Sequence, residues 1–298
     1  MGSRRKFIKH TGLGLGSLLV SPNIAESKPS LKGNIKQVVA AWSFMAAGPK
    51  WSPEEFLTQC KSLGVSGVEL FPVEKWSLLK ELNMVCAATK SHTFVRGMNN
   101  KNHHAECFDA LEKAIKFTSA AGFPNVMTFT GLIDTSMEKN GSKVSREEGI
   151  KNCVEGYKKM ARIAEKKKVS MVLEPLNSVV SENMKGHPGY QGDHLEICME
   201  IIKSVSSPSL RLLFDVYHIQ IMDGNIIDNI NKYMEYIGHV QVAGVPGRGS
   251  IGEQQEINYR FIMKTLLKNG YKGYVGHEWI PDNNPVASLR EAVQICDV

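Results

Sequence analysis

The sequence predicts a single α/β domain, a parallel (β/α)8 barrel, and two features of the chain lead to this fold class. From residue 35 onward, short apolar or β-branched runs alternate with longer amphipathic stretches, which is the pattern of a parallel α/β protein. Eight such units fit into about 260 residues, close to the usual length of a closed barrel. With 42% hydrophobic and 22% charged residues, the 298-residue chain has an ordinary globular composition and enough apolar side chains for a large core.

The predicted strands are continuous apolar runs rather than strictly alternating ones, as is typical of parallel strands buried on both faces. In chain order they cover residues 36–41, 66–70, 83–88, 124–129, 169–174, 210–215, 238–243 and 273–278. The longest irregular stretches follow strands and cover residues 89–103, 130–144 and 177–191. In a barrel, the loops after strands carry the active site, so we expect a functional site at that end.

Capping residues mark the ends of the predicted helices. Ser52, followed by Pro53 and two glutamates, begins one helix, which closes at Leu63-Gly64. Ser145 caps a helix over residues 146–168, whose final lysines suit the negative end of the helix dipole. The remaining helices are predicted over residues 104–121, 192–204, 226–236, 258–269 and 286–296.

The N-terminus resembles a twin-arginine export signal. Residues 3–9 (SRRKFIK) place an arginine pair before an apolar residue and a lysine, and residues 11–20 form a mildly apolar run. That run is too short to span about 30 Å of hydrocarbon as a helix. We therefore predict a cleavable signal at residues 1–25, a linker at 26–34 and the barrel at 35–298. The expected consequences are export by the twin-arginine machinery to the periplasm or cell exterior, and no stable membrane anchor. A basic N-terminal arm is the alternative.

The positive charge of the chain belongs mostly to this predicted signal. The full chain has 36 basic and 30 acidic residues, a formal net charge of +6. Residues 1–25 contain four basic residues and no acidic one, so their removal leaves 32 against 30, or about +2. Such a balance gives no case for a nucleic-acid partner, and the partner that we expect is a small-molecule substrate.

Six cysteines lie scattered through the predicted helices and strands, and no two form a CxxC pair. In a domain of this size, single cysteines in such segments behave as small buried hydrophobic residues more often than as a disulfide framework. We therefore expect them to be buried and unpaired.

Four of the predicted strands end in an oxygen-bearing side chain: Glu174, Asp215, Gln241 and Glu278. They fall on the fifth to eighth strands, whose carboxyl ends converge on one mouth in a barrel. Three converging carboxylates without a cation would repel one another and be costly to desolvate. Oxygen-only ligands that include an uncharged amide suit Mg²⁺ or Mn²⁺ better than zinc. A lone acidic residue at a strand end is usually a helix cap or a surface ion pair, but four oxygen-bearing side chains at matching positions, three of them acidic, predict a divalent metal site.

The strings around these residues resemble the hydroxypyruvate isomerase family, within the xylose-isomerase-like barrel superfamily. They are LEPLN (173–177), FDVYHIQIMDGN (214–225), HVQVAGVPGR (239–248) and GYKGYVGHEW (270–279). The resemblance covers residues 35–298. YHIQIMDGN and VAGVPGR are specific to the family, whereas LEP and HEW mark only the superfamily.

The resemblance implies that the four residues bind the metal and that Glu174 and Glu278 also form the acid/base pair, on opposite sides of the substrate. It implies that His218 hydrogen-bonds a substrate oxygen and that Arg248 faces the substrate, where a planar guanidinium matches a carboxylate. Gln241 favours this family, because the epimerase branch usually has histidine there. The implied reaction interconverts hydroxypyruvate and tartronate semialdehyde by proton transfer between adjacent carbons through an enediolate.

Two other functions stay open. An exported epimerase or isomerase of a larger keto-sugar would use the same metal site, and export favours it because hydroxypyruvate is ordinarily intracellular. A non-catalytic sugar-binding barrel is disfavoured, because a binding module would need neither glutamate.

Several other side chains are candidates for the wall of the pocket, and each also has a plain structural interpretation. The loop histidines are His92, the pair His103-His104, His187 and His194, and Trp42 follows the first strand. His239 lies two residues before Gln241, on the same strand face but deeper, so we expect it to pack in the core.

Overall fold

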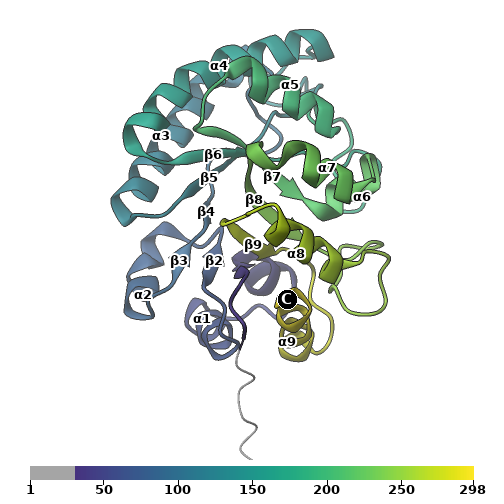
Figure 1. Cartoon of the computed structure of the whole chain (residues 1–298). Helices are drawn as coiled ribbons and strands as arrows, with labels where there is room; N and C mark the ends of the chain where they lie inside the picture. The colour runs from purple at the N-terminus through teal and green to yellow at the C-terminus, as the bar shows by residue number, and fades with distance from the viewer. Residues whose placement is uncertain (1–30) are drawn as a thin grey trace, which may run out of the picture. The chain divides into compact units, whose positions relative to one another are not determined.

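Parallel strands surround a central axis and the helices lie outside them (Figure 1). The computed structural model describes residues 31–298, so the predicted signal and most of the predicted linker lie outside the described residues. The strands are β1 (Lys36–Ala40), β2 (Gly67–Glu69), β3 (Val85–Cys86), β4 (Ala88–Thr89), β5 (Asn125–Thr128), β6 (Ser170–Leu173), β7 (Leu210–Asp215), β8 (Ile237–Val242) and β9 (Tyr274–His277). The predicted strands are thus all present, most with ends within one or two residues.

The strand order is β3-β2-β1-β9-β8-β7-β6-β5-β4, and all the pairs are parallel. Strands β3 and β4 are one extended segment interrupted at Ala87. The Ala87 N–H donates to the Val68 carbonyl, and the Leu70 N–H donates to the Ala88 carbonyl, each at 2.8 Å. The segment therefore borders β2 on one side and β5 on the other, which makes the sheet a nearly closed ring. The predicted (β/α)8 barrel is confirmed for residues 31–298.

The main helices of the described residues are α1 (Pro53–Ser62), α2 (Trp76–Glu81), α3 (His104–Ala121), α4 (Arg146–Lys167), α5 (Leu195–Val205), α6 (Val216–Met222), α7 (Ile226–Tyr233), α8 (Tyr259–Lys268) and α9 (Pro285–Cys296). Shorter helical turns cover Ser43–Ala47, Val73–Lys75, Lys101–His103 and Met234–Tyr236. Both predicted caps are present, since Ser52 accepts a hydrogen bond from the Glu55 N–H and Ser145 accepts one from the Glu148 N–H.

Two helices were not predicted, α2 and α6. Each has at most seven residues, too few for a 3.6-residue period to be recognised in the sequence. Helix α6 begins directly after Asp215, whose carboxylate accepts a hydrogen bond from the Tyr217 N–H at 2.8 Å. One of the predicted site residues therefore also caps a helix.

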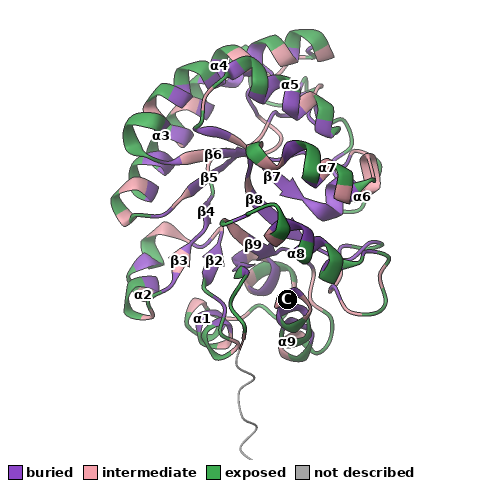
Figure 2. Cartoon of the chain, viewed as in Figure 1, coloured by how far each residue is buried: buried purple, intermediate pink, exposed green. Residues whose placement is uncertain are grey.

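The core lies between the strands and the inward faces of the helices, while the outward helix faces are exposed (Figure 2). All six cysteines are buried and unpaired, as predicted. A separate apolar cluster of Met127, Val172 and Leu213 fills the barrel interior, with Leu70 and Phe129 packed against it. Within residues 31–298, no helix has the length and apolar character needed to cross a membrane.

Candidate active site

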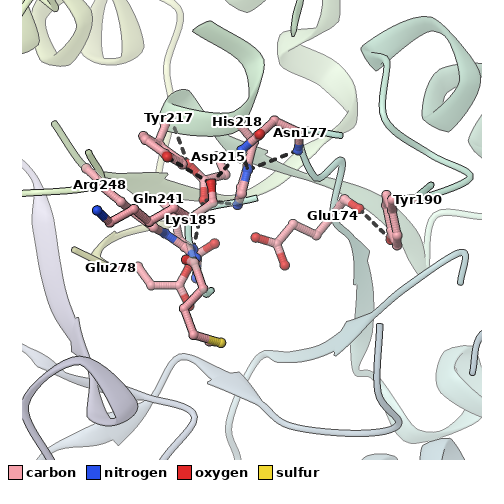
Figure 3. Close-up of polar contacts among 12 residues, drawn as sticks. Glu174, Asn177, Lys185, Tyr190, Asp215, Tyr217, His218, Gln241, Arg248 and Glu278 are labelled. Carbon is pink, nitrogen blue, oxygen red and sulfur yellow. Dashed lines mark hydrogen bonds and ion pairs between the residues drawn. The ribbon is translucent and has the colours of Figure 1, made fainter. Parts of the chain in front are cut away.

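The four predicted ligands meet at the carboxyl end of the barrel, as strand geometry requires. Glu174 follows β6, Asp215 ends β7, Gln241 lies near the end of β8, and Glu278 follows β9. All four are buried, and each exposes at most 3% of its surface. In Figure 3, Glu174 extends from one side toward the group formed by the other three. Glu174 and Glu278 line a cavity of about 270 Å³.

Three oxygen atoms of this group are buried without a hydrogen-bond partner among the described residues. They are Glu174 Oε1, Asp215 Oδ2 and Gln241 Oε1. Buried acceptors without partners are rare in folded proteins, because each loses its hydrogen bonds to water without replacement. Three of them on neighbouring strands therefore indicate a shared ligand that carries positive charge or donates hydrogen bonds.

The carboxyl groups are held in an environment that disfavours their charge. Burial, then the charges of Glu278 and Asp215, raise the pKa of Glu174 well above its ordinary value. Burial raises the pKa of Asp215 to about 6 and that of Glu278 to about 8, and in both cases the Arg248 charge opposes the rise. One guanidinium thus has to compensate three buried acids.

Arg248 is the cation of the site and is itself buried. Its Nη2 lies 2.7 Å from Glu278 Oε2 and 3.7 Å from Asp215 Oδ2. Its guanidinium lies over two aromatic rings, 5.2 Å from the Trp42 centroid and 5.5 Å from that of Tyr217. This aromatic contact on top of the ion pair fixes the plane of the guanidinium against Glu278. Arg248 also lines the cavity.

His218 reaches the site from α6, and its hydrogen bonds define its tautomer. The Asn177 backbone N–H donates to His218 Nδ1 at 3.0 Å, and the Asn177 amide nitrogen lies 2.7 Å from the same atom. Because Nδ1 accepts a hydrogen bond, the neutral ring carries its proton on Nε2. Burial lowers the pKa of His218 well below its ordinary value, so the ring is neutral.

A ring nitrogen of His218 and one oxygen each of Glu174 and Asp215 lie within 4.8 Å of one another, the spacing of a possible metal site. The tautomer argues against a ligand role for this histidine, because a protonated Nε2 has no lone pair to give. Nε2 has no hydrogen-bond partner among the described residues and lies 3.7 Å from Asp215 Oδ2. His218 is therefore placed as a neutral hydrogen-bond donor at the edge of the site.

The loop over residues 177–191 is held against the site through backbone carbonyl groups. Asn177 Nδ2 and the Tyr217 hydroxyl each donate to the Lys185 carbonyl at 2.8 Å. Arg248 Nη1 donates to the Met184 carbonyl at 2.6 Å. The loop also contributes His187 to the cavity wall, where burial, together with the Arg248 charge, lowers its pKa to about 4.

The other candidates from the sequence fall into different places. His92 lines the cavity, and its Nε2 lies 2.9 Å from Thr128 Oγ1. His103 and His104 are buried but do not line the cavity, and His194 is exposed beside Asp223.

Trp42 both lines the cavity and donates from Nε1 to Glu278 Oε1 at 2.7 Å. One of the two oxygens of Glu278 is therefore held by Trp42 and the other by Arg248.

Glu69, which ends β2 and is fully buried, was not among the residues predicted for the site. Its Oε1 accepts a hydrogen bond from Gln241 Nε2 at 2.8 Å, and its Oε2 lies 2.5 Å from His239 Nε2. His239 is buried on the same face as Gln241, as expected. A short strand ending in one acidic residue carries no local signal of such a contact, because both partners are far along the chain.

The wall of the cavity combines apolar and polar side chains. The apolar residues are Leu70, Phe94, Met127, Phe129, Leu176 and Met184. Lys90, His92 and Thr93 also line it. The volume lies just below the range of about 300–1,000 Å³ that is usual for ligand pockets.

Comparisons with known proteins place residues 57–297 in a family whose model is described as "Xylose isomerase-like TIM barrel". A human protein named putative hydroxypyruvate isomerase is 32% identical over 181 residues, which cover 61% of this chain and 62% of the human protein. The match therefore spans about three fifths of the length of that relative. Hydroxypyruvate isomerase of Escherichia coli (strain K12) is 27% identical over 271 residues, which cover 86% of this chain and 95% of that protein.

Solved structures share the fold. A protein described as AP endonuclease, family 2, from Brucella melitensis superposes with a TM-score of 0.74 at 25% identity, covering 86% of this chain and 97% of that one. The IOLI protein, whose structure is described as having a binding zinc atom, superposes with a TM-score of 0.67 at 17% identity, covering 88% of this chain and 95% of that one. Identity as low as that of the second shows the fold alone.

Proposed function

We propose that this chain, which belongs to the xylose isomerase-like TIM barrel family, is a divalent-metal-dependent isomerase of a small hydroxy-keto compound. Hydroxypyruvate, interconverted with tartronate semialdehyde, is the leading substrate. The observation that carries the proposal is the set of three unpartnered buried oxygens beside Glu278 at one end of the barrel. The relatives named hydroxypyruvate isomerase support the choice of reaction.

The chemistry of the donor set fits a divalent cation. Glu174, Asp215 and Gln241 each offer an oxygen that no described residue satisfies. Each oxygen of Glu278 accepts one hydrogen bond and keeps a second lone pair. Oxygen-only donors suit Mg²⁺ or Mn²⁺, although the IOLI structure with zinc makes zinc the natural third ion to test. When bound, such a cation supplies polarisation of the substrate carbonyl and stabilisation of developing oxyanion charge.

Proton transfer falls to the two glutamates. Glu174 follows β6 and Glu278 follows β9, both line the cavity, and they extend from different sides in Figure 3. A group that takes a proton from one carbon and returns it to the next works best when its pKa lies near the working pH. Burial raises the pKa of Glu278 to about 8, so this carboxyl group can accept and release a proton near neutrality. The pKa of Glu174 is raised in the same direction, well above its ordinary value.

Two further residues bind and orient the substrate in this proposal. His218 offers its unpartnered Nε2–H to a substrate oxygen, and its neutral ring allows it to donate without adding charge. Arg248 lies at the cavity wall with its plane fixed by Trp42, where it attracts a substrate carboxylate. The same guanidinium holds Glu278 in place, so substrate binding and the orientation of one acid/base group share a residue.

The cavity volume favours a short substrate over a six-carbon sugar, since about 270 Å³ is small for a ligand pocket. A keto-sugar epimerase or isomerase is the second candidate. The polar side chains of Lys90, His92 and Thr93 in the cavity wall favour it, because additional hydroxyl groups could be bound there. Export by the twin-arginine machinery, proposed from residues 1–25, would also favour a substrate outside the cytoplasm.

The proposed export has its own test. Replacing Arg4 and Arg5 by lysine should abolish export, and unchanged export would contradict that part of the proposal.

A substrate panel tests the function directly. Hydroxypyruvate, short ketoses and keto-sugars are incubated with protein and Mn²⁺ or Mg²⁺ in D₂O, and solvent deuterium is located by NMR. We expect incorporation at a carbon next to the carbonyl of one compound, lost in Glu174→Gln and Glu278→Gln and after metal removal by EDTA. Glu112→Gln, an exposed carboxylate on α3, is the matched control. Full exchange in either active-site variant would refute the proton-transfer roles, and binding of a sugar without any exchange would favour a sugar-binding barrel.

A further inference from the structure

A buried carboxylate outside the four predicted ligands lies directly behind one of them. Glu69 is fully buried at the end of β2 and does not line the cavity. In the sheet, β1 and β9 separate β2 from β8, yet the Glu69 side chain contacts two residues of β8, His239 and Gln241. The carboxylate therefore crosses the barrel interior instead of bonding to a neighbouring strand.

A glycine on the intervening strand provides the space for this crossing. Gly276 of β9 is the register partner of Gln241. A Cβ atom built on Gly276 would lie 2.5 Å from Glu69 Oε2 and 2.6 Å from Oε1, far inside van der Waals contact. Any larger residue at this position would push the carboxylate away from Gln241. The glycine is thus required by the side chain that passes over it and not by its own backbone angles.

The contact determines which end of the Gln241 amide faces the site. An amide has a donating nitrogen and an accepting oxygen, and only the oxygen can bind a cation. Gln241 Nε2 donates to Glu69 Oε1 at 2.8 Å, so this hydrogen bond holds the amide nitrogen on the Glu69 side. Gln241 Oε1 is thereby turned away from Glu69, and it is one of the three buried oxygens without a partner. His239 holds the second oxygen of Glu69.

We propose that Glu69 is a positioning residue that keeps the oxygen of Gln241, and not its nitrogen, directed at the metal position. The inference rests on the proposed metal site. Partners that orient a metal ligand typically contribute 10- to 100-fold to metal affinity when removed. A buried Glu–His pair that served only stability would change the free energy of unfolding and leave cation affinity unaltered.

The test measures Mn²⁺ affinity of EDTA-stripped full-length protein by titration calorimetry, without substrate. Glu69→Gln keeps the volume but offers Gln241 both a donor and an acceptor, so it no longer selects one amide orientation. We expect Mn²⁺ binding about 10- to 100-fold weaker. Gly276→Ala should weaken it in the same direction, because the added methyl group displaces Glu69 without altering its chemistry.

The control is Gln37→Leu. Gln37 is a buried side chain of β1 that bridges His277 and the Val293 carbonyl, and neither of these partners belongs to the proposed ligand set. It should lower unfolding stability and leave Mn²⁺ affinity at the wild-type value. Wild-type affinity in folded Glu69→Gln would overturn the role of Glu69 while leaving the metal site intact. If Glu69→Gln does not fold, unchanged affinity in Gly276→Ala overturns it. No Mn²⁺ binding by the wild-type protein would overturn both proposals.

Discussion

Glu174→Gln should stabilise the metal-free protein while removing its response to metal. The Glu174 carboxylate receives no hydrogen bond from a described side chain, and its Oε1 is buried without a partner. Replacing it by a neutral amide of the same shape removes an uncompensated buried charge, which we estimate at about 2 kcal/mol. For a domain of this size, about 2 °C per kcal/mol converts this into a rise of about 4 °C in the unfolding midpoint.

The sign and pH window of this effect follow from the pKa of Glu174. Because the folded chain raises that pKa well above its ordinary value, the folded state binds the proton more tightly than the unfolded state. The wild-type protein therefore loses stability as pH rises from the ordinary value of 4.5 toward the raised one. The advantage of the variant should be absent near pH 4 and grow as pH increases.

Thermal unfolding of EDTA-stripped protein at pH 5 and pH 8, with EDTA or with Mn²⁺ in its place, measures both effects. Mn²⁺ at 100 times its dissociation constant should stabilise the wild-type protein by about 2.7 kcal/mol and the variant by much less. Glu112→Gln, which removes an exposed charge, should behave as wild type under every condition. A variant that unfolds below the wild-type temperature in EDTA at pH 8 would refute the reasoning, because the Glu174 carboxylate would then make net favourable contacts.

Further predictions concern pH, the Trp42 contact and the core. Mn²⁺ binding should strengthen from about pH 5 to pH 8, because the pKa of Asp215 is about 6 and that of Glu278 is about 8. Calorimetry in buffers of different ionisation enthalpy would count the protons released on binding, and a pH-independent Mn²⁺ affinity would contradict the prediction. Trp42→Phe removes the hydrogen bond to Glu278, so kcat at pH 7 should fall about tenfold and the acidic limb of the pH profile of kcat should move to higher pH. An acidic limb at the wild-type pH would contradict a role of this hydrogen bond in catalysis. Phe56→Ala should lower unfolding stability by about 3–5 kcal/mol in urea without changing Mn²⁺ affinity.

The sequence could predict the strands and the four residues at their ends because both signals are local. An apolar run with turn residues on either side defines a strand, and the barrel rule then brings the ends of strands five to eight together. The side chains of Glu174, Asp215, Gln241 and Glu278 do lie at one end of the barrel. Their metal-binding and catalytic roles, and the domain boundaries at residues 25 and 34, stay predictions.

What the sequence could not supply depends on contacts between distant segments. Glu69 and Gln241 are 172 positions apart, and no motif around either predicts the other. Trp42 and Glu278 are 236 positions apart, so the sequence could only suggest that the indole lines the pocket. The loop over 177–191 takes its shape from hydrogen bonds to Tyr217 and Arg248, which are known only once α6 and the segment after β8 are in place.

The charge of the site explains why the fourth predicted ligand is an amide. With Glu174, Asp215 and Glu278 ionised and Arg248 protonated, the buried cluster carries two negative charges, which one divalent cation neutralises. A fourth carboxylate at position 241 would leave an uncompensated buried charge and could not donate the 2.8 Å hydrogen bond that Gln241 gives to Glu69. Glutamine avoids both costs, since its nitrogen satisfies Glu69 and its oxygen remains for the cation. The neutral tautomer of His218 keeps the same balance, because it can bind substrate without adding charge.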